Sequence, residues 1–119
     1  MIDITSEDKK GLIIMHVKGE LDLNTATDFK NAVSDKLAAK PATIALDFSG
    51  LVYLDSSGIG ALVKLNKTAH DSHTDLVLYD VEEGIRNMFK LSRLETIFTI
   101  LNYKDFYSRY LRSEERRVG

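Results

Sequence analysis

The sequence contains no cysteine, a single proline and no long apolar run. The absence of cysteine excludes disulfide bonds, thiolate metal sites and cysteine nucleophiles. No segment approaches the roughly 18 consecutive apolar residues that a membrane-spanning helix needs. Lys and Arg number 16 against 18 Asp and Glu, and this net charge of -2 gives no electrostatic reason to expect binding to nucleic acid or to an anionic membrane.

The N-terminal segment and the histidines narrow the possible classes further. "MIDITSEDKKGLIIMHVKGE" places acids before a short apolar run, the reverse of an export signal, so we expect a cytoplasmic protein. The three histidines, His16, His70 and His73, are scattered along the chain. We therefore expect neither a metal site nor a bound cofactor.

With 119 residues and 44% hydrophobic content, the chain has the size of one domain with one core. Apolar spacing predicts strands at 2–5, 12–22, 42–48, 74–81 and 95–101 and helices at 24–40, 58–70, 82–94 and 103–111. The first two strands should pair as a hairpin, and the later helices are long enough to return the chain for parallel pairing. The sequence therefore predicts an α/β fold with a mixed, mainly parallel central sheet, an N-terminal hairpin and about four helices.

Each predicted helix is expected to turn one set of side chains toward the sheet. These are Ala26, Phe29, Val33 and Leu37 in the first helix, Ile59, Leu62, Val63 and Asn66 in the second, and Ile85, Met88 and Phe89 in the third. Asn24 or Thr25 is expected to cap the first helix. We expect residues 1–111 to form the domain and the charged tail at 112–119, "RSEERRVG", to be disordered, and we assign no function to that tail.

The stretch "LDSSGIG", residues 54–60, lies where a strand gives way to a helix. Ligands and partners commonly meet an α/β sheet at such a place. Asp55, Ser56 and Ser57 are each able to cap the helix, although a cap needs only one side chain. Gly58 and Gly60 permit a tight turn and a close approach by another chain. Two interpretations explain this pattern: a helix cap with a spare hydroxyl, or a hydroxyl with a function. The presence of more capping side chains than one helix needs favours a functional hydroxyl.

Catalysis by Ser56 would require a base and an orienting acid, and the stretch is not a G-x-S-x-G motif. His16 lies in a predicted strand, and His70 and His73 flank the far end of the helix, about 18 Å from its serine end. The stretch also lacks the G-x-x-x-x-G-K-[ST] pattern of a phosphate-binding loop and the third glycine of a dinucleotide site. We therefore predict no catalytic residue, and a hydroxyl that receives chemistry from another protein.

A second acid follows another predicted strand. The segment "GELDLNT" ends that strand at a helix start and carries Asp22. If its strand lies beside the strand at 42–48, Asp22 and Asp55 come close together near Ser56. A turn glycine with a pair of solvated acids explains the same residues, so both interpretations stay open at this point.

Three segments together resemble a known family. "GELDLNTATDF", "TIALDFSGLVYLDSSGIGALVKL" and "GIRNMFKLSRLETIF" follow one another as in the STAS domain of bacterial anti-sigma factor antagonists. The resemblance covers residues 10–101, and "LDSSGIG" after an apolar strand is its most specific part.

This resemblance implies a protein that is switched by phosphorylation. The unphosphorylated domain is expected to bind an anti-sigma factor and so to free a sigma factor. That anti-sigma factor, also a serine kinase, is expected to phosphorylate Ser56, and a PP2C-type phosphatase to restore the binding form. The positions that match the family around this site, and that we expect to contact the partner, are Asp22, Asp55, Ser56, Ser57, Gly58 and Gly60.

Two other functions stay open. A STAS domain can serve as a scaffold without a switch, for example as a subunit of a sensory assembly or of a lipid-transport complex. A small hydrolase that uses Ser56 is the candidate from another class, and the missing base disfavours it. Between the two adjacent hydroxyls, only the family's acid, matched by Asp55, assigns the phosphate to Ser56.

Overall fold

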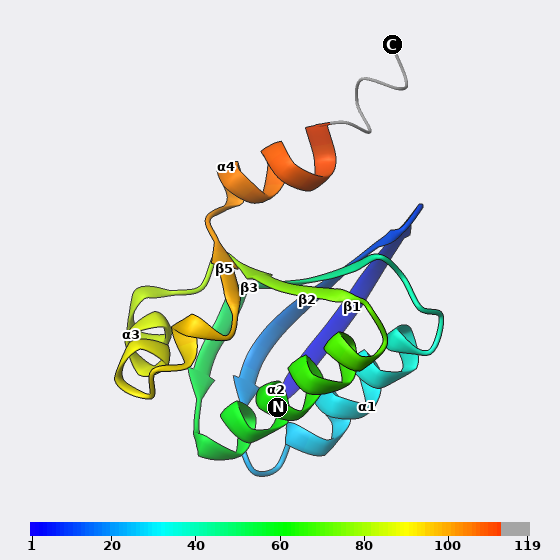
Figure 1. The fold of residues 1–119 in the computed structure, drawn as a ribbon. Coiled ribbons are helices and arrows are strands. Elements are labelled where there is room, and N and C mark those ends of the chain that lie inside the picture. Colours follow the sequence, from blue (N-terminus) through cyan, green and yellow to red (C-terminus); the bar gives the residue numbers. More distant parts are fainter. Residues whose placement is uncertain (113–119) are drawn as a thin grey trace.

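The strands lie side by side in one sheet, in the order in which they occur in the chain (Figure 1). The computed structural model describes residues 1–112. Its elements are β1 (Ile2–Lys9), β2 (Leu12–Leu21), α1 (Ala26–Leu37), β3 (Thr43–Leu54), α2 (Ser56–Asp71), β4 (Asp75–Tyr79), α3 (Glu83–Leu91), the short 3-10 helix η1 (Leu94–Thr96), β5 (Thr99–Leu101), α4 (Tyr103–Phe106) and the π-helical η2 (Tyr107–Leu111). Apart from its first residue, the tail predicted at 112–119 lies outside the described residues.

The predicted α/β class with a mixed, mainly parallel sheet is confirmed. β1 and β2 form the antiparallel hairpin, and the three later pairings are all parallel. The crossovers through α1, α2 and α3 are what allow neighbouring strands to run in the same direction. None of the described helices combines the length and the apolar character that crossing a bilayer requires.

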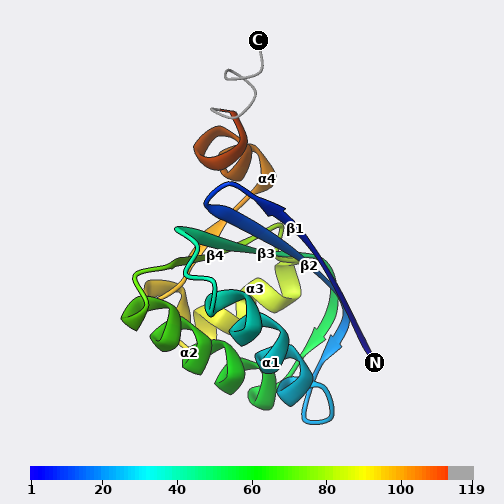
Figure 2. The same ribbon diagram turned by 90° about the vertical axis from the view of Figure 1, so that its right-hand side faces the viewer.

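The sheet separates two layers of helices (Figure 2). α1, α2 and α3 cover one face, and α4 with η2 lies over the other. Strand side chains alternate between the faces, so Ile13, Met15 and Val17 join the larger core, whereas Leu12 and Ile14 join the smaller one. β4 is buried on both faces, which explains its continuous apolar sequence.

The inner face of α2 differs from the prediction. Leu62 is buried as expected, but Val63 is exposed, and Ile59 and Asn66 are only half-buried. The residues that face the sheet are Gly58, Ala61, Leu62, Leu65 and Ala69. Most of these are small, because the helix lies close to the strands, and small residues give a weak apolar signal in a sequence. The predicted inner faces of α1 and α3 are confirmed by their buried residues, which are Phe29, Val33, Leu37, Ile85 and Phe89.

The ends of two predicted strands also differ from the structure. β3 does not end at residue 48, because it continues to pair with β2 as far as Leu54. The strand predicted at 95–101 is shortened to Thr99–Leu101, and η1 takes the place of its first residues. Phe98 packs edge-on against Phe89, with ring centroids 5.6 Å apart, so part of this apolar run fills the core instead of extending the strand.

Candidate functional site

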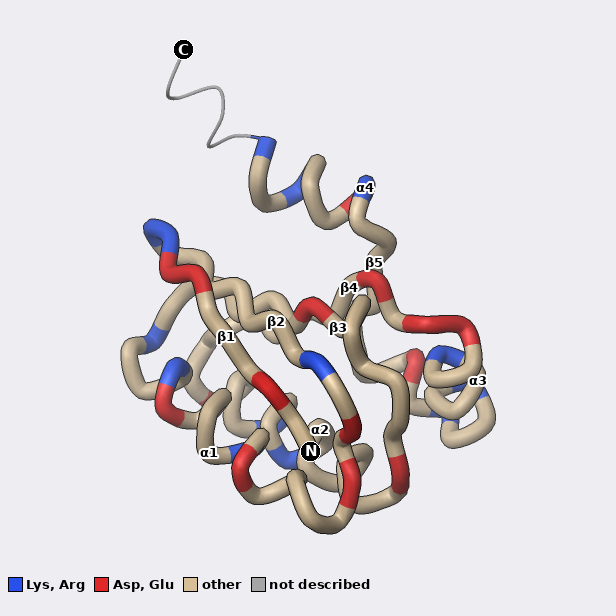
Figure 3. The backbone as a smooth tube through the Cα atoms, turned by 180° about the vertical axis from the view of Figure 1, so that it is seen from behind, with Lys and Arg blue, Asp and Glu red and all other residues tan. Residues whose placement is uncertain are grey.

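The carboxyl ends of β2 and β3 meet at one edge of the sheet, and each is followed by a helix (Figure 1). Leu21 pairs with Leu54, and the backbone N–H of Asp55 donates to the carbonyl oxygen of Leu21 at 3.2 Å. Asp22 and Asp55 line the same hollow, which has a volume of about 500 Å³. Figure 3 shows acidic residues along the lower part of the tube, where these strands end. The parallel pairing thus brings together the two acids that the sequence placed after separate strands.

Asp55 is the cap of α2. Its Oδ1 accepts hydrogen bonds from the backbone N–H groups of Ser57 at 2.9 Å and Gly58 at 3.2 Å. One carboxylate therefore satisfies two of the amides that a helix start leaves open. Ser56 is the first helical residue and is exposed, whereas Ser57 is half-buried. Within residues 1–112, neither serine hydroxyl makes a hydrogen bond, so both are left over from the capping of the helix.

Asp22 organises the loop before α1 in a similar way. Its Oδ1 accepts from the backbone N–H groups of Asn24 at 2.9 Å and Thr25 at 3.1 Å. Thr25 occupies the cap position, as predicted, but its hydroxyl donates to the carbonyl oxygen of Glu20 at 2.8 Å instead of capping the helix. Both acids at this edge are thus engaged in shaping their own loops.

The two glycines of "LDSSGIG" have different surroundings. Gly58 is buried, and a Cβ at this position would lie 2.6 Å from Leu54 Cδ1 and 2.8 Å from the carbonyl oxygen of Leu21. Its lack of a side chain lets α2 approach the ends of β2 and β3. Gly60 is exposed, and a Cβ there would meet nothing within 4 Å. The expected contact of Gly58 with a partner stays untested, whereas its packing role is visible.

Three exposed apolar residues beside the acids escaped the sequence analysis. Leu23 is 76% exposed, Val52 73% and Tyr53 50%, and all three line the hollow that Asp22 and Asp55 share. The strand predicted at 42–48 stops short of Val52 and Tyr53, so the sequence does not predict which way these two side chains point. An apolar surface next to exposed Ser56 is typical of a place where another protein docks.

The histidines lie away from this edge. His16 contacts Glu7 and Asp47 and lines a cavity with Tyr103 and Tyr107, on the face of the sheet that α4 and η2 cover. His70 lies in the last turn of α2. No histidine lines the hollow beside Ser56 and Asp55 or the groove beside Ser57. Among residues 1–112, no three His, Asp or Glu are placed to hold a metal ion. Ser56 is therefore exposed and has no histidine beside it among the residues that line these two hollows.

Comparison with protein families matches residues 3–107 to the STAS domain. The anti-sigma-B factor antagonist of Listeria monocytogenes is 28% identical over 101 residues, which cover 85% of this chain and 88% of that protein. The anti-sigma F factor antagonist of Paenibacillus polymyxa is 24% identical over 83% of this chain and 86% of that protein.

Solved structures share the fold. An anti-sigma factor antagonist from Mycobacterium paratuberculosis superposes with a TM-score of 0.77 at 23% identity, covering 85% of this chain and 86% of that one. The Bacillus protein SpoIIAA, an anti-sigma factor antagonist, matches at 19% identity over 90% of this chain. Its unphosphorylated form has a TM-score of 0.74 over 95% of that chain, and its phosphorylated form 0.68 over 98%.

Proposed function

The chain belongs to the STAS domain family, and we propose that it is an anti-sigma factor antagonist whose docking is switched off by phosphorylation of Ser56. A serine kinase activity of the anti-sigma factor adds the phosphate, and a PP2C-type phosphatase removes it. The observation that carries the proposal is the exposed Ser56 hydroxyl, which is left free because Asp55 caps α2. The names of the related proteins support the choice of an anti-sigma factor as the partner.

A phosphate on Ser56 changes the charge of the docking surface. It adds about -1.5 to -2 charges at neutral pH, close to Asp22 and Asp55. The backbone amides of Ser57 and Gly58, which could have bound it, already donate to Asp55. A partner that covers this edge must strip water from the new charge, at a cost of several kcal/mol unless it supplies cations. The phosphorylated protein therefore stays folded but loses its partner.

The kinase supplies all of the chemistry except the acceptor oxygen. Ser56 Oγ attacks the γ-phosphorus of ATP, its proton passes to a base of the kinase, and ADP leaves. The phosphatase transfers the phosphoryl group to water, which restores the hydroxyl and releases inorganic phosphate. The exposure of Ser56 gives both enzymes access without any rearrangement of the fold.

The test combines binding with mapping of the phosphate. The protein is mixed with candidate anti-sigma kinases and ATP, and the modified residue is identified by mass spectrometry. We expect phosphate on Ser56, with Ser57→Ala still modified and Ser56→Ala unmodified yet able to bind the kinase. Failure of the unmodified protein to bind any such kinase would sink the proposal. Equal binding of the phosphorylated and unphosphorylated forms would instead indicate a scaffold without a switch.

A further inference from the structure

The outward face of α2 begins at Ser56 and continues along the whole helix. Ser56, Gly60, Val63, Lys67 and His70 follow one another at spacings of four and three residues, so they share one side of the helix. All five are exposed. The side chain that sequence analysis placed inside, Val63, therefore belongs to the same surface as the proposed phosphorylation site.

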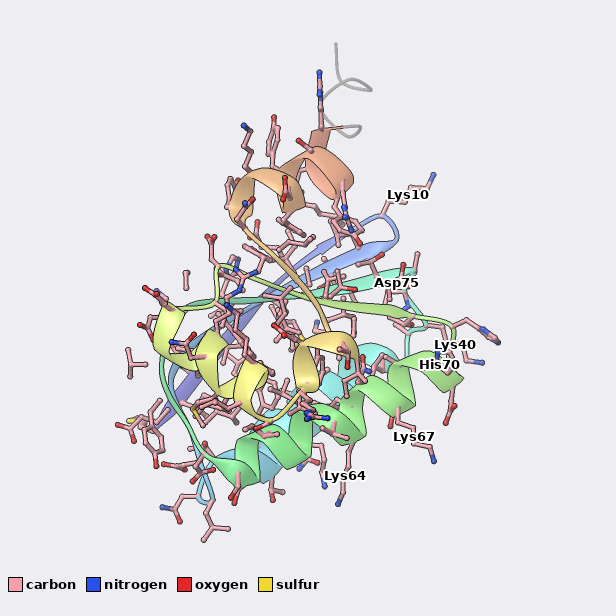
Figure 4. All side chains as sticks on the ribbon, turned by 60° about the vertical axis from the view of Figure 1, so that its left-hand side comes forward. Lys10, Lys40, Lys64, Lys67, His70 and Asp75 are labelled. Carbon is pink, nitrogen blue, oxygen red and sulfur yellow. The ribbon has the colours of Figure 1, made fainter. Side chains whose placement is uncertain are left out.

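This face carries positive charge in a protein whose net charge is -2. The cations Lys64 and Lys67 project from α2 near His70 (Figure 4), and the first acid of the helix is Asp71. We call these three residues, together with Lys30 of α1 on one side and Arg109 of η2 on the other, the basic ridge.

Hollows on both sides of α2 are lined by residues of the basic ridge. The groove between α1 and α2, about 220 Å³ in volume, is lined by Lys30 and Lys64 and by no acid among the described residues. A larger cavity of about 540 Å³, between α2, β4 and η2, is lined by Lys67 and Arg109, with one acid, Asp75. Within residues 1–112, none of these four cations forms an ion pair. Positive charge is therefore available to a partner on both sides of the helix.

We propose that the basic ridge docks an acidic segment of the anti-sigma factor, in continuity with the site at Ser56; this inference rests on the proposed function. The segment lies along α2, with carboxylates opposite the lysines and an apolar side chain opposite Gly60 and Val63. Gly60 has open space around its Cα, so a partner chain is able to approach the helix backbone there.

The chemistry of the surface favours an acidic protein segment over nucleic acid or an anionic membrane. Val63 interrupts the cations with an apolar contact, and the acids Asp22 and Asp55 lie at the serine end of the same surface. A phosphate backbone would be repelled by those acids, and a few cations neutralise too few phosphates for strong binding. A folded partner is able to match both the acidic serine end and the basic ridge, because it can place its own acidic groups only opposite the lysines of α2.

The far part of the basic ridge is distant from the switch. Lys67 follows Ser56 by eleven residues, which is about 16 Å along the helix axis, whereas the Debye length is about 8 Å at physiological salt. A phosphate on Ser56 is therefore largely screened from Lys67, whereas Lys30 and Lys64 line the groove that reaches Ser57. The basic ridge determines the association rate of the partner, and the phosphorylation state of Ser56 determines whether the complex is stable.

The test reverses charge on the ridge and compares it with the same change elsewhere. Lys64→Glu/Lys67→Glu is compared with Lys10→Glu/Lys90→Glu. Both control lysines are exposed: Lys10 lies in the hairpin turn (Figure 4), and Lys90 lies on α3. Association with the anti-sigma factor is followed by stopped flow at low and high salt. We expect the ridge variant to associate about tenfold more slowly at low salt and almost as fast as the unaltered protein at high salt, with the control within about twofold.

The outcomes of this test distinguish a failure of the basic ridge from a failure of the proposed function. If the unaltered protein binds the anti-sigma factor but both double variants behave alike, the basic ridge is not part of the interface, although the proposed function stands. If the unaltered protein binds no anti-sigma factor, the proposed function itself fails. Duplex DNA and phosphatidylserine vesicles serve as alternative ligands. If the unaltered protein binds either of them and the ridge variant does not, the choice of an acidic protein segment is overturned. Melting curves of both double variants establish that they are folded.

Discussion

His16 Nδ1 lies 2.6 Å from Asp47 Oδ2, a contact that joins the neighbouring strands β2 and β3. The other ring nitrogen, Nε2, lies 2.6 Å from Glu7 Oε2 on β1. Both ring nitrogens are donors only in the protonated imidazole. The hydrogen bonds to Glu7 and then to Asp47 raise the pKa of His16 above its usual value of 6.5, against the smaller opposing effect of burial. In its protonated form, His16 thus joins three strands.

We expect the stability of the fold to decrease as the pH rises through the pKa of His16. Because that pKa is raised in the folded state, His16 is protonated to a greater extent in the folded protein than in the unfolded chain above pH 6.5. The stabilisation is complete below this pH and is lost as the pH passes the folded pKa. Urea denaturation at a series of pH values measures it. His16→Gln should flatten this part of the profile, and an unchanged slope would show that another group is responsible.

Asp47 should limit stability at the acid end. Burial by itself raises the pKa of its carboxyl, but hydrogen bonds from His16 and from the Ser49 backbone outweigh it and hold the pKa below the usual 3.8. The contribution is therefore present above pH 3.8 and is lost as the pH falls through the lowered pKa. Acid unfolding of the unaltered protein and of Asp47→Asn is followed by circular dichroism. The Asp47→Asn variant should not show this loss of stability at low pH.

Replacing the two glycines of the site by alanine should have opposite effects. At Gly58 the new Cβ would press on Leu54 and on the backbone of Leu21, so we expect a loss of about 1–3 kcal/mol in unfolding free energy. At Gly60 it meets open space, so we expect a gain of up to about 1 kcal/mol from helix propensity. Urea denaturation compares the two variants. Equal effects would contradict a close approach of α2 at Gly58.

A negative charge at Ser56 should weaken binding without unfolding the domain. Ser56→Asp is expected to bind the anti-sigma factor at least about tenfold more weakly, a loss of about 1.4 kcal/mol. Its melting temperature should stay close to that of the unaltered protein, because Ser56 is exposed and its hydroxyl makes no hydrogen bond to the described residues that the change would break. Ser56→Asn, with a similar shape and no charge, is the control. If Asn weakens binding as much as Asp does, charge is not the cause.

The exposed apolar residues beside the acids should matter for binding and not for stability. Tyr53→Ser, or Leu23→Ser with Val52→Ser, is expected to reduce affinity for the anti-sigma factor by about tenfold or more, as truncation of an interface centre does. Stability should change by less than about 0.5 kcal/mol because these side chains face solvent. Leu91→Ser is the matched control, since Leu91 is 86% exposed on α3. An equal loss of affinity in the control would rule out a specific apolar contact.

The order of strands and helices was predictable because apolar period is a local property. β4 is buried on both faces, so its sequence is a continuous apolar run that can be recognised as a strand. The helices between the hairpin and β4 have a clear apolar inner face, which identifies them as helices. Boundaries were less predictable. Nothing local distinguishes Phe98, which packs on Phe89, from a strand residue, and nothing local shows that β3 continues to pair beyond residue 48.

The sequence by itself determined that a helix starts near Asp55 and that more hydroxyls stand there than a cap needs, because capping involves groups only two or three residues apart. Only the tertiary structure decided that Asp22 and Asp55 share one hollow. It also decided that Gly58 packs against Leu21 and that Val63 joins the outward face. These relationships join residues distant in sequence or depend on which side of a helix meets the sheet, so they follow from packing, which no local pattern encodes.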